Sequence, residues 1–372
     1  MAAKKIIVVG CGFAGLTCAL KLAKVKNIEV LLFDQRSENN FLPMLPDIIG
    51  GKVLPLYLKF NLGLLNKGNT RFINRKVERV DFAARKLYAG SETFAYDYLV
   101  LAAGAQTNFY GNETIKTYAL KLFSVQDALA ILEAVKAPKI KSVIVVGGGY
   151  TGVELAASLK YFFDKAGLTR QVVVVERANS LLPGFSEYEK DYIQSNLCIM
   201  GIEARLNTEL ASITQDTVSL KDGKIYDKSV LIWSAGVKAV DLDISGEVKY
   251  DNQARLKVDG YLRLRDDVFC LGDMACVTTE KGNLRMGVQF AVAQGRLCAK
   301  NIINLINHRP LQVYKPVDLG YIVPMANNKS CGKVLGVKVT GFAGILCHYF
   351  MCVWRAFSLT NKVGIIKAVI FR

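Results

Sequence analysis

Histidine is scarce in this chain, and no two cysteines lie at C-x-x-C spacing. The 372 residues include two histidines, His308 and His348, which are too few and too far apart to predict a metal site. Most of the nine cysteines lie inside apolar runs. We therefore expect reduced cysteines in the core of a cytosolic protein. We also expect no secretory signal peptide, because the sequence enters an apolar strand almost at once.

Acidic residues are missing from the last part of the sequence. After Asp318 there is no Asp or Glu, whereas five lysines and two arginines lie there among apolar runs. The whole chain has a formal net charge of +16, which by itself would suit nucleic acid. The basic residues are not interleaved with aromatic residues as on an RNA-binding surface, so we predict no nucleic-acid partner. A basic and apolar segment instead indicates a surface for anionic lipid.

Hydrophobic runs of membrane-spanning length are also absent from this segment. Val339–Trp354 is apolar apart from Thr340 and His348, and it is shorter than the roughly 20 residues that a spanning helix needs. A second apolar piece, Val363–Phe371, contains Lys367. We expect the two pieces to form an interfacial helical anchor. A buried core or dimerisation helix is the alternative, so a homodimer stays open.

Two glycine-rich loops with the same pattern are present. Each G-x-G-x-x-G follows an apolar strand and opens an apolar helical run, at residues 6–20 and 143–159. The first glycine allows a tight turn, the second lets the backbone approach a pyrophosphate, and the third lets the helix pack on its strand. The pyrophosphate would lie at the helix N-terminus, where free N–H groups favour an anion. The glycines are Gly10, Gly12 and Gly15 in the first loop and Gly147, Gly149 and Gly152 in the second.

An acidic residue ends the next apolar strand about 20 residues after each loop, at Asp34 and Glu176. A carboxylate at this position is where a ribose hydroxyl would be held. Two ligand-free doubly wound sheets are the alternative, but packing alone does not require three glycines and an acid twice. We therefore predict two dinucleotide sites.

Strands that end in small residues indicate how the two sites are arranged along the chain. Small residues at 102–105 and 234–236 follow apolar strands, as expected where backbone passes close to a cofactor. The second strand would close the second domain, and the first domain resumes near residue 240. We predict an α/β fold with two Rossmann-like dinucleotide-binding domains, the second inserted in the first, and a C-terminal basic apolar membrane-associating segment. The expected boundaries are 1–110, 111–238, 239–320 and 321–372.

Several residues have two interpretations from the sequence alone. Asp273 follows an apolar strand and either binds cofactor hydroxyls or caps a helix. Gln289 and Gln294 lie in a predicted helix over 287–303, as satisfied core amides or as ligand contacts. Glu154 lies in the first turns of a helix, where the dipole stabilises a carboxylate.

Two stretches between the motifs carry weaker expectations. The prolines within Phe41–Gly51 predict that this stretch is not a regular helix. It would either pack over a flat cofactor or form an ordinary loop. Thr70–Asp81 alternates between apolar and polar residues and suits strands of a small sheet layer.

Taken together, these motifs give the chain a family resemblance over about residues 4–305. It resembles the type II NADH dehydrogenases, single-subunit NADH:quinone oxidoreductases of the two-dinucleotide-binding-domain flavoprotein superfamily. The basic apolar tail is similar to that family's membrane-anchoring end. The matching stretches are GCGFAG at 10–15, FLPMLPD at 41–47, AAGAQTN at 102–108, GGGYTGVELAASL at 147–159, LIWSAGV at 231–237, FCLGDMA at 269–275 and VQFAVAQGRLCAKNI at 288–302.

The resemblance implies FAD-dependent transfer of two electrons from NADH to a membrane quinone, without proton pumping, by a peripheral respiratory-chain enzyme on the cytoplasmic face of the cell membrane. It implies that NADH is bound as the substrate and FAD as the cofactor. The implied FAD contacts are Gly10, Gly12, Phe13, Ala14, Gly15, Asp34, Gln35, Val77, Ala103, Gly104, Gly272, Asp273, Gln289 and Phe290. The implied NADH contacts are Gly147, Gly149, Tyr150, Thr151, Gly152, Glu176, Ala235 and Gly236.

The same resemblance implies catalytic roles for Glu154, Gln289 and Gln294, with Glu154 near the flavin and the two glutamines towards the quinone. A carboxylate at Glu176 would repel a 2′-phosphate and so favour NADH, although Arg177 beside it could accept one. The chain departs from the family pattern at Leu42 and Ala293, where polar residues are usual.

Alternatives within flavoenzymes differ in their cysteines and acceptors. A dithiol disulfide reductase needs a cysteine pair after the first helix, and none lies between Cys18 and Cys198. A sulfide:quinone oxidoreductase uses cysteines close to the flavin, and Cys331 alone cannot form that pair. A sulfide:quinone oxidoreductase-like enzyme stays a weaker alternative, and two others stay open. One is a flavoprotein reductase that passes electrons from NAD(P)H to a protein partner, and the other is a FAD-bound, non-enzymatic subunit of a membrane complex.

Overall fold

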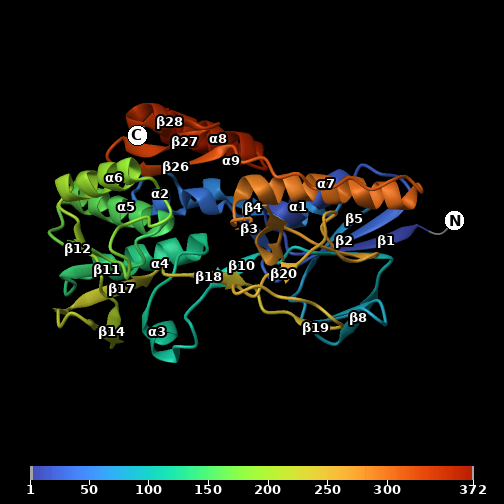
Figure 1. Ribbon diagram of the computed structural model, residues 1–372, viewed down its shortest axis with the longest axis horizontal. Coiled ribbons are helices and arrows are strands. Elements are labelled where there is room, and N and C mark those ends of the chain that lie inside the picture. Colours follow the sequence, from blue (N-terminus) through green and yellow to red (C-terminus); the bar gives the residue numbers. More distant parts are fainter. Residues whose placement is uncertain (1–2, 281, 371–372) are drawn as a thin grey trace. The chain divides into compact units, whose positions relative to one another are not determined.

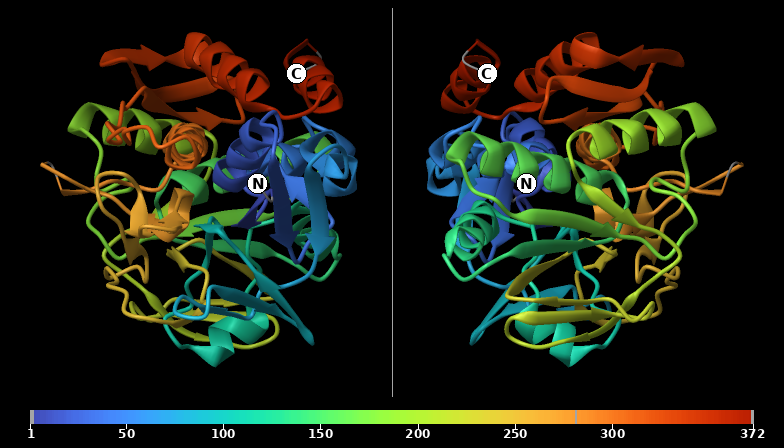
Figure 2. Two further views of the ribbon diagram at one scale, coloured as in Figure 1. Left: turned by 90° about the vertical axis from the view of Figure 1, so that its right-hand side faces the viewer. Right: turned by 90° about the vertical axis from the view of Figure 1, so that its left-hand side faces the viewer.

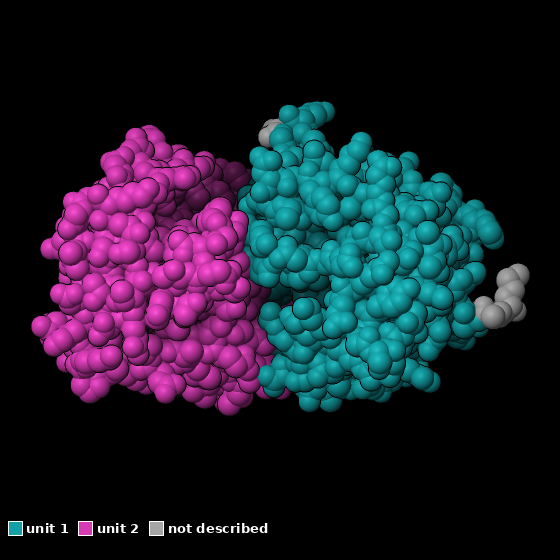
Figure 3. Space-filling view, turned by 90° about the horizontal axis from the view of Figure 1, so that it is seen from below, with its two compact units in different colours: residues 1–39, 61–106, 237–318 teal, residues 40–60, 107–236, 319–372 magenta. Residues whose placement is uncertain are grey.

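The computed structural model describes residues 3–280 and 282–370 (Figures 1 and 2). The chain forms two compact units, each built from three segments (Figure 3). Unit 1 contains residues 1–39, 61–106 and 237–318, and unit 2 contains 40–60, 107–236 and 319–372. Residues 107–236 therefore interrupt unit 1, as an inserted domain would. Residues 319–372 group with unit 2 in this division. The division into four parts with the boundaries given above stays a prediction.

Unit 1 is organised around a mostly parallel sheet of six strands. The strand order is β21 (Arg263–Arg265), β22 (Val268–Cys270), β9 (Tyr98–Leu101), β1 (Lys4–Val9), β2 (Ile28–Asp34) and β5 (Thr70–Asn74). The central strand β1 pairs in parallel with both β2 and β9, and its residues 6–9 are buried. A continuous apolar run is expected for a parallel strand that is covered on both faces. Helices α1 (Phe13–Leu22) and α7 (Val288–Ile306) pack against each other beside this sheet (Figure 1).

The remaining elements of unit 1 are short. An antiparallel ribbon of β6 (Arg79–Asp81), β7 (Lys86–Ala89) and β8 (Glu92–Ala95) is joined by β19 (Asp243–Ser245). The expectation for Thr70–Asp81 was thus half wrong, because β5 extends the main sheet and only β6 belongs to the small one. The other elements are η3 (Leu62–Leu65), β20 (Leu256–Lys257), η4 (Gly272–Met274), β23 (Ala275–Cys276), β24 (Thr278–Thr279) and β25 (Gly282–Asn283). The short strands β3 (Glu38–Asn40), β4 (Lys59–Asn61), β10 (Ala105–Thr107) and β18 (Val237–Ala239) lie where the chain passes between units.

Unit 2 has its own parallel sheet, in the order β13 (Glu203–Arg205), β12 (Gln171–Val175), β11 (Ser142–Val146) and β17 (Ser229–Trp233). The helices within residues 107–236 are α3 (Glu113–Tyr118), α4 (Val125–Lys136), α5 (Tyr150–Ala166) and α6 (Glu187–Ile199). The Ser124 side chain accepts a hydrogen bond from the Asp127 N–H at 3.0 Å and so caps α4. An antiparallel sheet contains β14 (Leu210–Ile213), β15 (Thr217–Leu220) and β16 (Ile225–Asp227).

The proline-containing stretch 41–51 contains one short α-helix, contrary to the prediction, and is not α-helical elsewhere. It forms η1 (Leu42–Met44) and then α2 (Leu45–Ile49). Each proline, Pro43 and Pro46, lies in the first turn of its helix. The missing N–H of proline costs no helical hydrogen bond at that position, which explains why the prediction was wrong. A further 3₁₀ helix, η2 (Pro55–Leu58), follows.

The C-terminal part of unit 2 is a layer of three antiparallel strands and two helices, drawn in red in Figures 1 and 2. These are β26 (Gly320–Met325), β27 (Lys329–Val334), β28 (Val337–Thr340), α8 (Gly341–Arg355) and α9 (Leu359–Ile370). Helix α8 packs on β26 and β27, which also contact α5 and α6, and α9 packs on η2. Among the residues that the structure describes, no helix combines the length and apolarity that crossing a membrane requires. Phe371, at the end of the second predicted apolar piece, lies outside the described residues.

Candidate functional site

The first glycine loop is shaped by close backbone contacts in unit 1. Gly10 has φ +99°, and a Cβ there would collide with the Ala102 carbonyl group at the end of β9. A Cβ at Gly15 would collide with the Gly10 carbonyl oxygen, so this glycine lets α1 start directly against the turn. Gly12 has no heavy atom within 4 Å of an added Cβ. The middle glycine thus presents open backbone at the helix N-terminus, as a pyrophosphate site requires.

The second loop repeats this construction in unit 2. Gly147 has φ +107°, and an added Cβ would lie 2.8 Å from Ala235 Cα. A Cβ at Gly152 would collide with the Gly147 carbonyl oxygen, whereas Gly149 faces open space. The hydroxyl of Ser234 donates to the carbonyl oxygens of Val146 (2.9 Å) and Gly147 (3.1 Å), which ties the end of β17 to the loop. In both loops an added Cβ would therefore collide with backbone at the first and third glycines and would meet open space at the second.

Each predicted acid binds its own glycine loop. Asp34 accepts hydrogen bonds from the Cys11 N–H at 2.8 Å and the Arg36 N–H at 2.9 Å. Glu176 does the same with the N–H groups of Gly148 (2.7 Å) and Ala178 (2.9 Å). Carboxylate oxygens accept more than one hydrogen bond each, so ribose hydroxyls could be added without displacing these contacts. Asp34 and Glu176 thus fix their loops, and their contact with a ribose stays a prediction.

The Gly272–Asp273 turn borders a small depression in unit 1. Its lining includes Asp273, Gly287, Phe290, Ala291 and Gln294. Asp273 is the second residue of η4 and makes no helix cap, so the capping interpretation was wrong. Burial raises the pKa of Asp273, although a hydrogen bond from the Gly287 N–H and the charge of Arg255 oppose this. An acid held in a concave site beside the first glycine loop suits contact with cofactor hydroxyls.

The two glutamines of α7 have different surroundings. Gln294 is buried, and its Oε1 accepts a hydrogen bond from the Gly272 N–H at 2.6 Å. Gln289 is half-buried, and its Nε2 donates to Asp318 Oδ1 at 2.9 Å, next to Arg285, which also binds Asp318. Gln294 therefore holds the turn that carries Asp273, a contact expected of a satisfied core amide.

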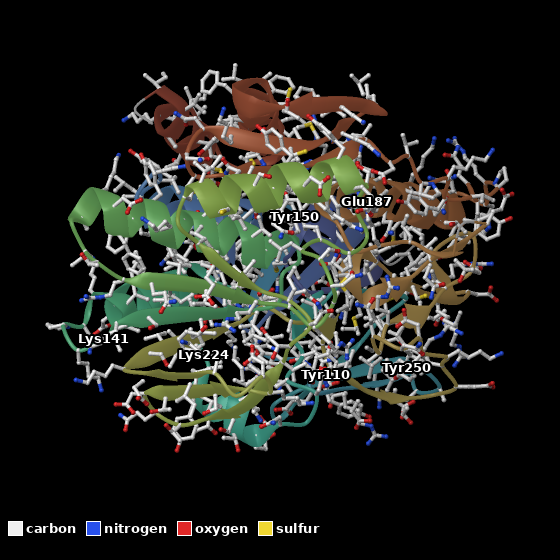
Figure 4. All side chains as sticks on the ribbon, turned by 60° about the vertical axis from the view of Figure 1, so that its left-hand side comes forward. Tyr110, Lys141, Tyr150, Glu187, Lys224 and Tyr250 are labelled. Carbon is white, nitrogen blue, oxygen red and sulfur yellow. The ribbon has the colours of Figure 1, made fainter. Side chains whose placement is uncertain are left out.

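Tyr110 is a residue near the second loop that the sequence analysis missed. Its hydroxyl donates to the Ala235 carbonyl oxygen at 3.1 Å, and its ring end occupies the space that a Cβ at Gly236 would need. The side chain is 68% exposed (Figure 4). The Trp233 indole N–H binds the Asn108 carbonyl oxygen at 2.8 Å, so 108–110 is fixed to 233–236 at two points. The only hint in the sequence was the requirement for glycine at 236.

Glu154 is buried in a cluster of ionisable side chains in unit 2. It is 6% exposed on α5, and burial followed by the charge of Asp47 raises its pKa well above the ordinary value. Desolvation therefore opposes the stabilisation that the helix dipole was expected to give the carboxylate. Asp47, on α2, accepts a hydrogen bond from the Tyr349 hydroxyl at 2.7 Å. Tyr150, labelled in Figure 4, hydrogen-bonds Glu154 and also donates to the Ile322 carbonyl oxygen of β26.

Comparison with known proteins identifies the family. A family model described as "Pyridine nucleotide-disulphide oxidoreductase" matches residues 4–295, more than half of the chain and both glycine loops. The chain belongs to this family. Curated relatives include the demethylphylloquinone reductase NdbB of Synechocystis sp., 28% identical over 94% of this chain and 92% of that protein. Another is the type II NADH:quinone oxidoreductase of Haemophilus influenzae, 27% identical over 89% of this chain and 87% of that protein.

Solved structures support the same fold for this pyridine nucleotide-disulphide oxidoreductase. The structure of NDH2 from Plasmodium falciparum in complex with NADH matches with a TM-score of 0.87 at 18% identity, over 99% of this chain and 97% of that one. The sulfide:quinone oxidoreductase of Aquifex aeolicus matches with a TM-score of 0.80 at 20% identity, over 97% and 92%. The predicted α/β fold class is therefore confirmed.

The remaining predicted contacts lie at varied depths in this family member. Phe13 and Ala14 are buried at the start of α1, and Ala103 and Gly104 follow β9 next to Gly10. Val77 is buried with the apolar core of unit 1, whereas Gln35 is exposed after β2. Thr151 is exposed at the second loop. Each predicted contact thus lies on the unit that carries its loop, and the cofactor roles of these residues stay predictions.

Eight of the nine cysteines of this pyridine nucleotide-disulphide oxidoreductase are at least partly buried. All nine are free thiols, as expected, but Cys198 is exposed on α6 and Cys347 is half-buried on α8. The expectation of core cysteines therefore fails at Cys198.

Proposed function

We propose that this protein transfers two electrons from NADH to a quinone with FAD as its cofactor, and that it does so at a membrane surface without pumping protons. The observation that carries the proposal is the pair of glycine loops. In each loop the middle glycine faces open space, and a carboxylate from the next strand accepts a hydrogen bond from a loop N–H group. The family membership and the names of its relatives, type II NADH:quinone oxidoreductase and demethylphylloquinone reductase, support an acceptor of the quinone class.

The residues of unit 1 fit a flavin dinucleotide. Gly12 and the N-terminus of α1 would bind the pyrophosphate, and Asp34 the adenosine ribose. Asp273 and the depression beside it would hold the polyol hydroxyls. A flavin bound there supplies the chemistry, by accepting a hydride equivalent and passing on two electrons. The protein positions it, and the Gln294 contact to Gly272 keeps the Asp273 turn in place.

The residues of unit 2 fit NADH. Gly149 would approach the pyrophosphate, and Glu176 the adenosine ribose, whose 2′-phosphate in NADPH the carboxylate would repel. Arg177 is exposed and makes a long ion pair of 3.9 Å with Glu209, so it is not held toward the ribose position. This supports a preference for NADH over NADPH. Tyr110 and Ala235 form the opposite wall of the second loop.

Glu154 would provide a proton for the acceptor half of the reaction. Reduction of a quinone to a hydroquinone consumes protons, and burial followed by the charge of Asp47 raises the pKa of Glu154, which favours the protonated form that a proton donor needs. Gln289, whose Nε2 donates to Asp318 Oδ1 at 2.9 Å, stays a proposed contact towards the quinone.

The outer face of the C-terminal layer is the proposed membrane-docking face. Its eight large apolar side chains recur at helical spacing and are exposed on α8 and α9, while the opposite faces of both helices are buried. Basic residues accompany them, and the segment has no acid after Asp318. Such a face is expected to lie in the interface of an anionic membrane, which would make the protein peripheral on the cytoplasmic side. The residues are Phe342, Leu346, Phe350, Trp354, Leu359, Val363, Ile366 and Ile370. A second copy covering this face, a homodimer, is the alternative.

Anaerobic stopped-flow on the purified holoprotein tests the function. We expect NADH to bleach the flavin quickly, and a menaquinone or ubiquinone analogue to restore it quickly. Bleaching without recovery would move the acceptor to a protein partner. Bleaching by sulfide or NADPH, with none by NADH, would contradict the proposal.

A further inference from the structure

The loop 108–112 of unit 2 is tied to the end of β17. The Asn108 N–H donates to the Gly236 carbonyl oxygen at 3.0 Å, and the Trp233 indole N–H donates to the Asn108 carbonyl oxygen at 2.8 Å. The ring centroids of Phe109 and Trp233 lie 6.5 Å apart. Both ends of the short segment 233–236 therefore hold Asn108, and the loop has a fixed base.

Tyr110 lies in this loop with a backbone conformation that bulky residues rarely adopt. Its φ is +52°, and such a conformation persists only where neighbouring contacts determine it. The Tyr110 N–H donates to Asn108 Oδ1 at 2.9 Å, and the Tyr110 hydroxyl donates to the Ala235 carbonyl oxygen at 3.1 Å. The backbone and the side chain of Tyr110 are thus both held, while the ring is 68% exposed.

The Tyr110 hydroxyl is held at the switch point of the unit 2 sheet. Strand β11 has β12 and β13 on one side and β17 on the other. In open α/β sheets a ligand binds outside the carboxyl ends of the strands, where the strand order reverses. Ala235 follows β17 at this point, and a Cβ added to Gly147 would lie 2.8 Å from its Cα. The Tyr110 hydroxyl therefore binds backbone that lies directly against the second glycine loop.

The two halves of a dinucleotide would extend to opposite sides of this loop. The pyrophosphate would lie at Gly149, and Glu176, which follows β12, would hold the adenosine ribose. The nicotinamide half then extends away from β12, towards the end of β17 and Tyr110. Nicotinamide is a flat aromatic ring, and such rings pack favourably on an exposed aromatic side chain.

We propose that Tyr110 is a binding residue for the nicotinamide half of NADH, against which its ring packs while its hydroxyl stays bound to Ala235. Binding costs this side chain little conformational freedom, because its loop and its hydroxyl are already held. The ring end occupies the space that a Cβ at Gly236 would need, so a larger residue there would displace Tyr110. This inference rests on the proposed function and adds a residue that lies outside both glycine motifs.

Calorimetric titration of the oxidised holoprotein with NAD⁺ and with ADP separates the two halves of the ligand. ADP contains the adenosine and two phosphates but no nicotinamide half. Tyr110→Ala should weaken NAD⁺ binding about tenfold, because the packing on the ring is lost, and should leave ADP binding unchanged. Tyr110→Phe keeps the ring but loses the hydrogen bond to Ala235, so we expect NAD⁺ binding to weaken about threefold.

Tyr118→Ala is the matched control for this titration. It removes another tyrosine of the same unit, 47% exposed on α3, and should bind both nucleotides like wild type. Anaerobic flavin reduction gives a second readout. In Tyr110→Ala the NADH concentration that half-saturates flavin bleaching should rise about tenfold. The quinone concentration that half-saturates reoxidation should stay the same.

Equal NAD⁺ affinity in wild type, Tyr110→Ala and Tyr110→Phe would overturn the inference and leave the proposed function standing. A parallel loss of NAD⁺ and ADP affinity in both variants would also overturn it, because Tyr110 would then only support the loop. The same loss in Tyr118→Ala would have that consequence too. Wild-type protein that binds both nucleotides but is not reoxidised by a quinone would refute the proposed acceptor and support the role of Tyr110. Wild-type protein that binds neither nucleotide would refute both.

Discussion

Replacing Phe350 and Trp354 by alanine should release the protein from anionic membranes. The two side chains are 66% and 71% exposed and lie on the same face of α8. Aromatic side chains of this size cover about 150–250 Å² each, so about 270 Å² of exposed surface is available to the lipid. At about 25 cal/mol per Å², full immersion would contribute about 7 kcal/mol. An interfacial helix immerses only part of this area, so we expect a loss of about 3 kcal/mol, or about a hundredfold in partition coefficient.

Vesicle co-sedimentation measures this loss. Phosphatidylglycerol-containing vesicles should bind the wild-type protein, and binding should weaken as salt screens its lysines. A control pair in the same unit, Leu129→Ala with Ile225→Ala, removes exposed apolar side chains from α4 and β16 and should bind like wild type. Equal vesicle binding by Phe350→Ala/Trp354→Ala and wild type would refute the argument. A wild-type dimer that ignores vesicles and dissociates in the variant would assign the face to a second copy.

Further outcomes follow from single side chains. Burial and the Asp47 charge raise the pKa of Glu154 above 4.5, so its stabilising effect is complete below that pH and is lost as pH rises towards the folded value. Glu154→Gln should remove this slope, at most about 1.4 kcal/mol per pH unit in urea unfolding, and an unchanged slope would exclude the buried proton. Gly364→Ala should destabilise the packing of α9 by about 1–3 kcal/mol, because the added Cβ collides with the Tyr57 ring. Gly184→Ala is the control, because its added Cβ meets open space and should leave stability unchanged. Limited proteolysis should cleave α9 faster in the first variant than in the second. Asp34→Asn should lower flavin retention on gel filtration at least tenfold, and full retention would argue against its place beside the ribose.

The nucleotide loops could be predicted from sequence because their chemistry is local. Gly10 and Gly147 have the positive φ that the turn requires, and Gly15 and Gly152 lie against the carbonyl oxygen of that first glycine, so the spacing records requirements within one strand-turn-helix unit. The acids follow from the next strand of the same unit. The fold class follows in turn, because two such units need two parallel sheets.

The surroundings of Asp47 and Glu154 could not be predicted in the same way. Asp47 and Tyr349 lie far apart in the chain, and the sequence near either residue does not predict their hydrogen bond. The dipole argument for Glu154 used only its own helix, whereas burial by neighbouring elements decides its pKa. Gln294 shows the same limit, since its partner is the Gly272 backbone of a distant turn. The prolines of 41–51 led to the wrong prediction that this stretch has no regular helix, because the effect of a proline depends on its position within a helical turn.

The interleaved segments of the two units affect how the chain acquires structure during synthesis. Residues 40–60 of unit 2 leave the ribosome before most of unit 1, and the strands and helices of 319–372 leave after all other parts of both units. Until then, the apolar surfaces of α5, α6 and η2 lack their C-terminal cover. Nascent chains stalled before residue 319 should therefore be held by chaperones. The proposed membrane-docking face forms together with the last piece of the core, so an incomplete protein would not yet present it.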